Sequence, residues 1–273
     1  MIEKTQGWIN LYKPIGMSSF SAIYKIKKKF NINKLGHAGT LDPNAEGVLP
    51  IAINKSTKLI PFVNTNSKKY IFKIKWGEQT STDDSEGAII NYSNNIPNED
   101  QIKKIINSFL GFTYQVPPKA SAVKVNGRRA YSILRGEEDF ILEPKKVFLK
   151  TISFLESYNN TSQFLIECGK GYYVRSLARD LALKLDTFGH VIELKRTKVG
   201  NFSEKTSILL DDLVKIGQSE FEFKFIHSSI SMLDDILAYE VDEKKDLNDI
   251  SLGKSIFINN NQLIKKPLNS DDK

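Results

Sequence analysis

The chain has 273 residues, of which 40% are hydrophobic and 26% charged, as is typical of a globular protein with one large domain and room for a small appendage. No apolar run is long enough to cross a bilayer and the polar start lacks a secretory core, so we expect a cytoplasmic protein. One cysteine excludes an internal disulfide, three histidines are too few for a zinc cluster, and 39 basic against 32 acidic side chains favour a polyanionic partner.

The first elements are a short strand at Gly7 to Leu11 and a basic helix at Ser21 to Phe30, which Ser18 or Ser19 would cap. Lys13 lies in the loop between them, where its ammonium could reach a phosphate. An exposed loop lysine without such a role is the alternative. The lysines on the helix favour a polyanion in the same way, although a charge run is also typical of a solvated helix face.

A shaped loop follows at Gly36 to Pro50, with the sequence GHAGTLDPNAEGVLP, and leads into a buried strand at Gly47 to Ile53. Its glycines permit unusual backbone conformations, and the proline after Asp42 biases that residue away from helical geometry. The Asp42 carboxylate is therefore presented from a turn, where an acid can also be only a turn-former or a helix cap. His37 can equally be a loop histidine that binds a backbone carbonyl.

A short helix at Ser56 to Val63 precedes a strand at Lys68 to Trp76, which alternates clearly, with four apolar side chains on one face and lysines on the other. Tyr70 lies on the apolar face, where periodicity predicts a core aromatic. The loop from Gly77 to Gly87 holds four acids and two threonines, but their spacing is not that of a calcium-binding loop.

An amphipathic helix at Asn98 to Phe109 ends before Gly111. Further on, Asn126-Gly127 is a strong hairpin signal. It places three basic residues at a loop tip, from which they can reach a phosphate backbone or simply be solvated. These residues are Lys124, Arg128 and Arg129.

Two strands, Lys146 to Glu156 and Ser162 to Cys168, precede a helix that runs to about Leu185 and carries Arg175 in its first turn. A cation there faces the positive end of the helix dipole, which is unfavourable unless an anion is near. The alternative is a surface arginine paired with Asp180 or Glu167.

The remaining pattern is a strand at His190 to Val199 and a helix containing Leu209 to Val214. We then expect about fifty residues with a weak strand near Ser255 to Ile258. The polar end NSDDK has the composition of a disordered tail.

Several motifs, in this order, resemble those of the tRNA pseudouridine-55 synthase family, TruB in bacteria. They are the Lys-Pro-x-Gly-Met-Ser-Ser phrase at Lys13, the GHAGTLDP run, Lys-x-Tyr at Tyr70, SAVKVNGRRAY, and Gly-x-Tyr-Val-Arg ending at Arg175. The resemblance covers residues 7–214. It implies an α/β (α+β) catalytic domain at 1–214, with a mixed, largely antiparallel sheet flanked by helices and an RNA-gripping insertion at about 115–145. Residues 215–273 would be a short C-terminal region with a reduced or absent PUA-like domain.

The resemblance also implies roles for single residues. Asp42 would be the catalytic residue, and Arg175 would pair with it. His37 would enter the RNA and help to displace the target base, Tyr70 would lie over that base, and Leu194 would form part of the apolar floor beneath it. Arg196 and Lys13 would contact RNA, and the insertion would grip it through Lys124, Arg128 and Arg129.

The implied reaction is the isomerisation of uridine to pseudouridine in the T-loop of tRNA, by a monomer that needs no cofactor or metal. An Asp42–Arg175 pair would keep the carboxylate ionised, because a close opposite charge lowers its pKa. Asp42 could attack C1′, add to C6 or remove the 2′ proton. Two other functions stay open: an RNA-binding or tRNA-folding protein in which catalysis is secondary, and a glycosidase that uses Asp42 and Glu46 as its acid pair.

Overall fold

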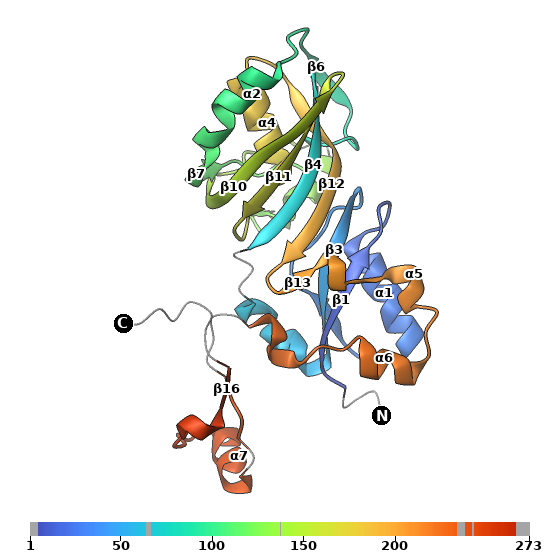
Figure 1. Cartoon of the computed structure of the whole chain (residues 1–273), viewed down its shortest axis with the longest axis vertical. Helices are drawn as coiled ribbons and strands as arrows, with labels where there is room; N and C mark the ends of the chain where they lie inside the picture. Colours follow the sequence, from blue (N-terminus) through green and yellow to red (C-terminus); the bar gives the residue numbers. More distant parts are fainter. Residues whose placement is uncertain (1–4, 64–66, 137, 234–237, 242, 266–273) are drawn as a thin grey trace.

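One mixed β-sheet connects most of the chain in a computed structural model that describes residues 5–63, 67–136, 138–233, 238–241 and 243–265 (Figure 1). Within these residues the sheet has ten strands. Its main path runs through β14 (Ile208–Leu209), β1 (Gly7–Lys13), β3 (Ala45–Ile53), β12 (Gly189–Val199), β4 (Lys68–Trp76), β11 (Thr161–Cys168), β10 (Lys145–Tyr158) and β7 (Gly111–Gln115). Off this path, β2 (Leu35–His37) pairs with β3, and β13 (Phe202–Ser203) pairs with β12.

The strand directions confirm the expected mixed, largely antiparallel α/β sheet. In the described sheet only β1–β14 and β12–β3 are parallel pairs. Strand β12 lies between β3 and β4, so Leu194 has Ala45 as its partner on one side and Phe72 on the other. Three segments that are distant in sequence thus lie side by side: the start of β3, the middle of β12 and the start of β4.

The helices bury the apolar faces of the sheet in two groups. Helices α2 (Glu99–Ile106) and α4 (Val174–Lys184) pack on β4, β10, β11 and β12, whereas α1 (Ser19–Phe30), α5 (Leu210–Leu213) and α6 (Gln218–Lys224) cover β1 and β3. Leu194 packs against both cores and therefore lies where they meet. No helix in the described part of the chain is long and apolar enough to cross a membrane.

The N-terminal elements follow from their sequence signals. The Ser18 hydroxyl accepts a hydrogen bond from the Ser21 amide and caps α1, as predicted. At the end of α1 the ring of Phe30 stacks on Phe221 of α6, with ring centroids 3.9 Å apart. Residues just beyond 214 therefore pack on the main body.

Strand β4 has the predicted bounds and alternation, with Tyr70 and Trp76 both buried. The helix expected at Ser56 to Val63 is instead a 3-10 helix, Asn54–Phe62, with Pro61 inside it. Proline lacks the amide hydrogen that a continuing α-helix would need there.

The basic hairpin is present as predicted. Strands β8 (Lys124–Val125) and β9 (Arg128–Arg129) pair around Asn126 and Gly127, whose φ angles are +49° and +81°. Both angles are positive, as a two-residue turn that matches the strand twist requires. The hairpin leads into the short helix α3 (Ala130–Arg135).

The C-terminal prediction of a strand near Ser255 to Ile258 is wrong: residues 254–259 have no regular structure, and Phe257 is 98% exposed. Apolar residues form strands only where a partner strand is available. The pairing is instead between β15 (Ala238–Tyr239) and β16 (Leu263–Lys265), on either side of α7 (Lys244–Ser251). The expected disorder of the NSDDK end concerns residues outside the described part.

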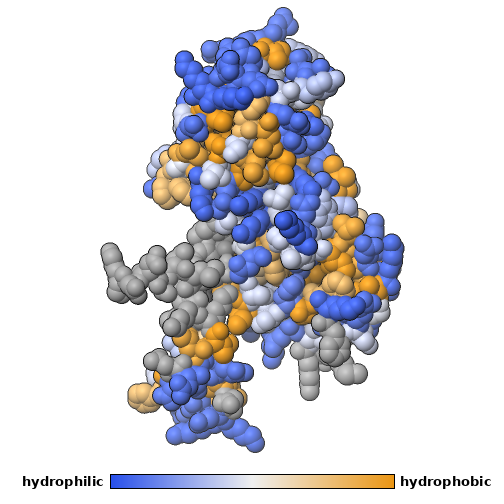
Figure 2. All heavy atoms as spheres, in the orientation of Figure 1, coloured by the Kyte–Doolittle hydropathy of each residue, from blue (hydrophilic) through white to orange (hydrophobic). Residues whose placement is uncertain are grey.

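Part of the sheet carries apolar side chains on its surface. Figure 2 shows them in a band over the strands at the front of the upper half. The exposed residues on β7 and β10 include Phe112, Tyr114 and Leu155.

Candidate active site

The loop that carries Asp42 is held in place by hydrogen bonds from a helix and from a neighbouring strand. Ser19 of α1 binds both the amide and the carbonyl of Leu41 through its hydroxyl, at 2.9 Å each. From β12, Arg196 donates to the carbonyls of Gly39 and Val48, at 2.9 and 2.8 Å. The turn is therefore a fixed platform, with Asp42 at its end.

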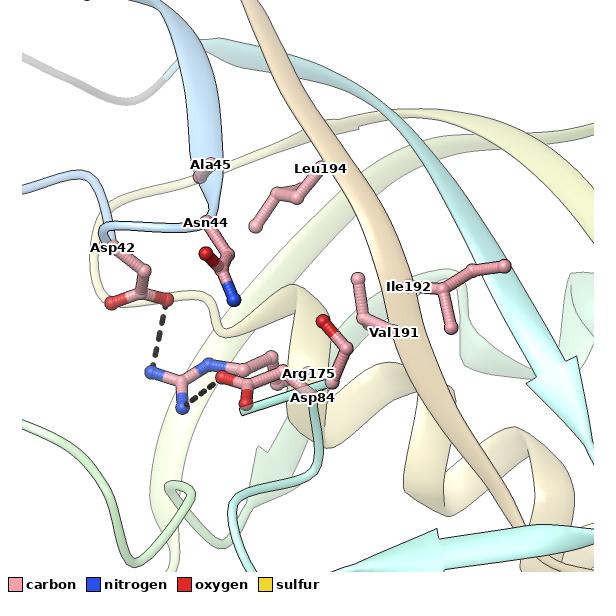
Figure 3. A pocket seen from close by; sticks show the side chains of 9 residues that line it. Asp42, Asn44, Ala45, Asp84, Arg175, Val191, Ile192 and Leu194 are labelled. Atoms are coloured by element: carbon pink, nitrogen blue, oxygen red, sulfur yellow. Dashed lines mark hydrogen bonds and ion pairs between the residues drawn. The ribbon is translucent and has the colours of Figure 1, made fainter. Parts of the chain in front are cut away.

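Arg175 lies between two carboxylates (Figure 3). Its guanidinium nitrogens are 3.0 Å from Asp42 and 3.0 Å from Asp84, so the expected Asp42–Arg175 pair is present. Further donations reach the carbonyls of Thr82 and Ala120, at 3.1 and 3.0 Å. The two anions explain how a buried cation can lie at the N-terminal end of α4.

The alternative that Arg175 is a surface arginine is wrong, because the residue is only 5% exposed. The partners suggested for it are engaged elsewhere. Asp180 pairs with Arg179, and Glu167 pairs with Lys69 and Lys150.

The pKa of Asp42 is shifted in the direction opposite to the one expected. The guanidinium of Arg175 acts to lower the pKa of the carboxyl, but burial raises that pKa by more, and the nearby Asp84 adds to the rise. The pKa of Asp42 thus lies above its ordinary value. Its side chain is still 38% exposed, against 6% for Arg175, so the carboxylate is the accessible member of the pair.

A cavity of about 630 Å³ opens beside this pair. Its volume falls within the range of roughly 300–1,000 Å³ that is typical of small-ligand sites. Asp42, Tyr70, Arg175 and Leu194 all line it, which confirms the predicted convergence of these side chains on one cleft. A small recess next to it, lined by Asn44 and by Leu194 on β12, is visible in Figure 3.

Tyr70 is both a core aromatic and a lining residue of the cavity. It is 7% exposed, and burial raises its pKa to about 12, so the phenol is neutral near pH 7. Leu194 faces the same cavity from the neighbouring strand. Together they give one part of the cavity an aromatic and aliphatic lining, which suits a planar base.

His37 lies at the end of β2, beside Ile51 of β3, and does not line the cavity. Its Nδ1 is buried and has no hydrogen-bond partner among the described residues. Burial and the positive charge of Arg196 lower the pKa of His37. The imidazole is therefore neutral near pH 7.

Two residues expected to contact RNA are buried instead. Lys13 is 0% exposed at the end of β1, and its ammonium donates to the carbonyls of Pro14 and Met17. Arg196 is 1% exposed and binds the Asp42 loop. Strand pairing on both sides turns these cations inward, so they hold backbone carbonyls and do not face solvent.

The three residues of the hairpin tip are exposed, but two are engaged within the chain. Arg128 forms a two-point ion pair with Glu138, at 2.8 and 2.9 Å, and Arg129 donates to the carbonyl of Ala122. Lys124 is exposed. Next to the hairpin, the carbonyl of Ala120 accepts a hydrogen bond from Arg175, which links this segment to the ion pair.

The sequence analysis missed two acidic residues. Asp84 holds Arg175, and Asp83 pairs with Arg179 at 2.8 Å. The available signal was the arginine in the first turn of α4, which needed a nearby anion, together with the acid-rich loop from Gly77 to Gly87.

The proposed glycosidase pair is not assembled. Glu46 follows Ala45 on β3 and interacts with the Tyr12 hydroxyl, whereas Ala45 is the residue that lines the recess beside Asp42. Successive residues of a strand point to opposite faces, so the two carboxylates do not flank one site. Among the described residues no cluster of three or more His, Cys, Asp or Glu could hold a metal ion.

Comparison with known families gives two matches that together cover most of the chain. The model of the TruB family pseudouridylate synthase N-terminal domain matches residues 27–174, and that of the tRNA pseudouridylate synthase B C-terminal domain matches residues 175–238.

Similar proteins carry a consistent name. The tRNA pseudouridine synthase B of Ehrlichia ruminantium (strain Gardel) is 42% identical over 268 residues, which cover 95% of this chain and 88% of that protein. The protein of the same name from Wolbachia pipientis subsp. Culex pipiens (strain wPip) is 47% identical over 211 residues, or 77% of this chain and 60% of that one.

Solved structures share the fold. A chain in the crystal structure of a Cbf5-Nop10-Gar1 complex matches with a TM-score of 0.61 and 31% identity, over 79% of this chain and 55% of that chain. A chain in the structure of an H/ACA RNP bound to a substrate RNA containing 2′-deoxyuridine gives 0.60 and 28%, over 81% and 55%. The chain thus spans just over half the length of these structural relatives.

Proposed function

The chain belongs to the TruB family of tRNA pseudouridine synthases, which are isomerases, and from this premise we propose that it converts uridine 55 in the T-loop of tRNA to pseudouridine, with Asp42 as the catalytic residue. The T-arm of tRNA is then the partner of a cytoplasmic monomer that needs no cofactor. The observation that carries this proposal is the position of Asp42: a half-exposed carboxylate at the edge of the cavity, with a buried arginine behind it.

The reaction conserves all atoms of the nucleotide. The bond between C1′ and N1 breaks, the uracil turns, a bond forms between C1′ and C5, and the proton lost from C5 is balanced by one gained at N1. A carboxylate next to the sugar can form and release a covalent bond or accept a proton. Asp42 alone can therefore act both when the C1′–N1 bond breaks and when the C1′–C5 bond forms. Arg175 fixes its orientation.

The detached base must be retained while it turns. In the proposed complex the uracil lies on the ring of Tyr70 and against Leu194, which both line the cavity. Stacking of a base on an aromatic ring contributes on the order of 1–3 kcal/mol. The few kcal/mol needed to extrude the base are offset by binding of the T-arm and by insertion of His37 into the RNA.

The test is pseudouridine mapping on an unmodified tRNA transcript, with the wild-type protein and Asp42→Asn, without added cofactor or metal. We expect conversion at uridine 55 by the wild type alone. Conversion at another uridine would support the proposed reaction but contradict uridine 55 as its target. If neither protein converts any uridine but both bind the transcript, the RNA-binding function replaces this proposal.

A further inference from the structure

Lys68 is the lysine of the Lys-x-Tyr motif, and no role follows for it from the reaction as described. It is the first residue of β4 and lies two positions before Tyr70, so both side chains point to the same face of the strand. Both line the cavity that holds Asp42. The lysine is half-buried in this position.

The ammonium of Lys68 has no acceptor among the residues that the structure describes. Within the described chain it makes no hydrogen bond and no ion pair, whereas the other two buried cations of the cavity are engaged. Arg175 is neutralised by Asp42 and Asp84, and Arg196 donates to three carbonyls. Lys68 therefore differs from them, because its donors have no partner in the described part of the chain.

The charged and titratable groups around Lys68 favour an additional anion. Arg196 on β12 and Lys170 both repel the ammonium. Cys168 on β11 does not compensate, because burial raises the pKa of its thiol to about 12. Burial first, and then Arg196, lower the pKa of Lys68 to about 8. A half-buried cation without a counterion is costly, and an anion bound next to it removes that cost.

The cavity is divided into two electrostatic ends. At one end, Asp42, Asp84 and Glu86 lie around Arg175, and Arg135 also lies near Glu86. At the other, the side chains of Lys68 and Arg196 converge on Gly39: a Cβ built there would lie 3.6 Å from the Lys68 ammonium and 3.4 Å from Nη1 of Arg196. A phosphate is repelled from the acidic end and attracted to the basic one.

The geometry also separates the Lys68 ammonium from the uracil that would stack on Tyr70. Two residues along a strand span about 6.6 Å. A base on the ring of Tyr70 thus has the Lys68 ammonium beyond its edge. The anionic groups that an RNA brings to that place are its backbone phosphates.

We propose that Lys68 binds a backbone phosphate of the tRNA next to the flipped uridine and so positions that nucleotide over Asp42. The inference rests on the proposed function for the identity of the RNA. It makes Lys68 a positioning residue, since its contact is to the backbone and not to the atoms that react.

The test compares Lys68→Met with Lys69→Met by tRNA binding over a series of KCl concentrations, all in the Asp42→Asn background so that no conversion occurs. Lys69 is a matched control on the same strand, because it lies on the opposite face and pairs with Glu167, which keeps Lys150 as a second partner. Loss of one phosphate contact reduces the slope of log K against log salt by about 0.7–0.9. We expect that reduction and a roughly tenfold weaker Kd at low salt for Lys68→Met, and neither for Lys69→Met.

Two further measurements separate this role from a structural one. Lys68→Arg keeps a charge at the site and should restore the slope. Lys68→Met removes repulsion with Arg196, so its urea unfolding midpoint should not fall below that of Lys69→Met. An unchanged slope in Lys68→Met, with or without a slower single-turnover rate in the Asp42-containing protein, would overturn the phosphate contact. Failure of the wild type to convert any uridine would overturn the proposed function instead, and leaves the salt slopes interpretable.

Discussion

Asp84 holds Arg175 at 3.0 Å from the side opposite to Asp42, so that one guanidinium joins the accessible carboxylate to a buried one. Asp84 also accepts hydrogen bonds from Thr82 Oγ1 at 2.5 Å and from the amide of Glu86 at 3.0 Å. Its position is therefore fixed by its own loop, and it anchors Arg175 independently of the substrate.

The first prediction concerns this anchor. Asp84→Asn removes the buried charge and leaves Arg175 with Asp42 as its one carboxylate partner among the described residues, beside the carbonyls of Thr82 and Ala120. Single-turnover conversion should slow by roughly tenfold or more, about 1.4 kcal/mol of barrier, while the Kd for tRNA stays within a factor of two. Asp83→Asn is the matched control, since that acid pairs with Arg179, and it should leave the rate nearly unchanged. Equal rates for the two variants would contradict this role of Asp84.

A second prediction follows from the raised pKa of Asp42. The proposed reaction uses the ionised carboxylate, so we expect the single-turnover rate to fall as the pH is lowered through that pKa. The midpoint should lie above the ordinary value of 3.8, because burial outweighs the effect of Arg175. Asp84→Asn removes a like charge and should shift the midpoint to lower pH. A midpoint at or below 3.8 in the wild type would show that the guanidinium dominates.

The third prediction concerns the alkaline side and Lys68. Phosphate binding requires the ammonium, whose pKa is about 8 in the free protein. Affinity for tRNA should be constant below that pH and weaken above it, by at most tenfold per pH unit. In Lys68→Met the part of this pH dependence that comes from Lys68 should be absent. Lys13 also has a pKa of about 8, but it does not line the cavity and is retained in the variant, so its contribution can be subtracted.

The fourth prediction tests Arg196 as a structural residue. Arg196 uses three separate nitrogens, Nε, Nη1 and Nη2, to reach the carbonyls of Val48, Thr40 and Gly39. The three donors of a lysine lie on one atom and cannot match this spread, so Arg196→Lys should cost about 2–4 kcal/mol of unfolding free energy. Urea denaturation measures this, with the exposed Arg129→Lys as control. A loss no greater than that of the control would restore Arg196 as a candidate for direct RNA contact.

The fifth prediction concerns Gly47, which has a φ of +111° in β3. A Cβ at this position would lie 2.2 Å from the carbonyl oxygen of Arg196, on the neighbouring strand. Gly47→Ala should therefore lower the unfolding free energy by more than about 3 kcal/mol. Gly217→Ala has no atom within 4 Å of the new methyl group and should be nearly neutral. Similar unfolding curves for the two variants would exclude close strand contact as the reason for this glycine.

Local signals in the sequence determined much of the fold. The alternation from Lys68 to Trp76, the turn at Asn126-Gly127 and the cap at Ser18 each depend on residues within a few positions of one another, and each has the predicted structure. The carboxylate of Asp42 is likewise presented from a loop, because the proline that follows it restricts its backbone.

The tertiary structure alone decided which charges are buried and what they bind. Lys13 and Arg196 resemble surface cations in sequence, but strand pairing turns them toward backbone carbonyls. Asp84 belongs to an acidic loop that meets Arg175 only when the sheet has formed. Lys68 has Arg196 and Lys170 as its charged neighbours and no acceptor among the described residues. These relationships join residues far apart in the chain, and a sequence pattern records the period of one strand but not its neighbours.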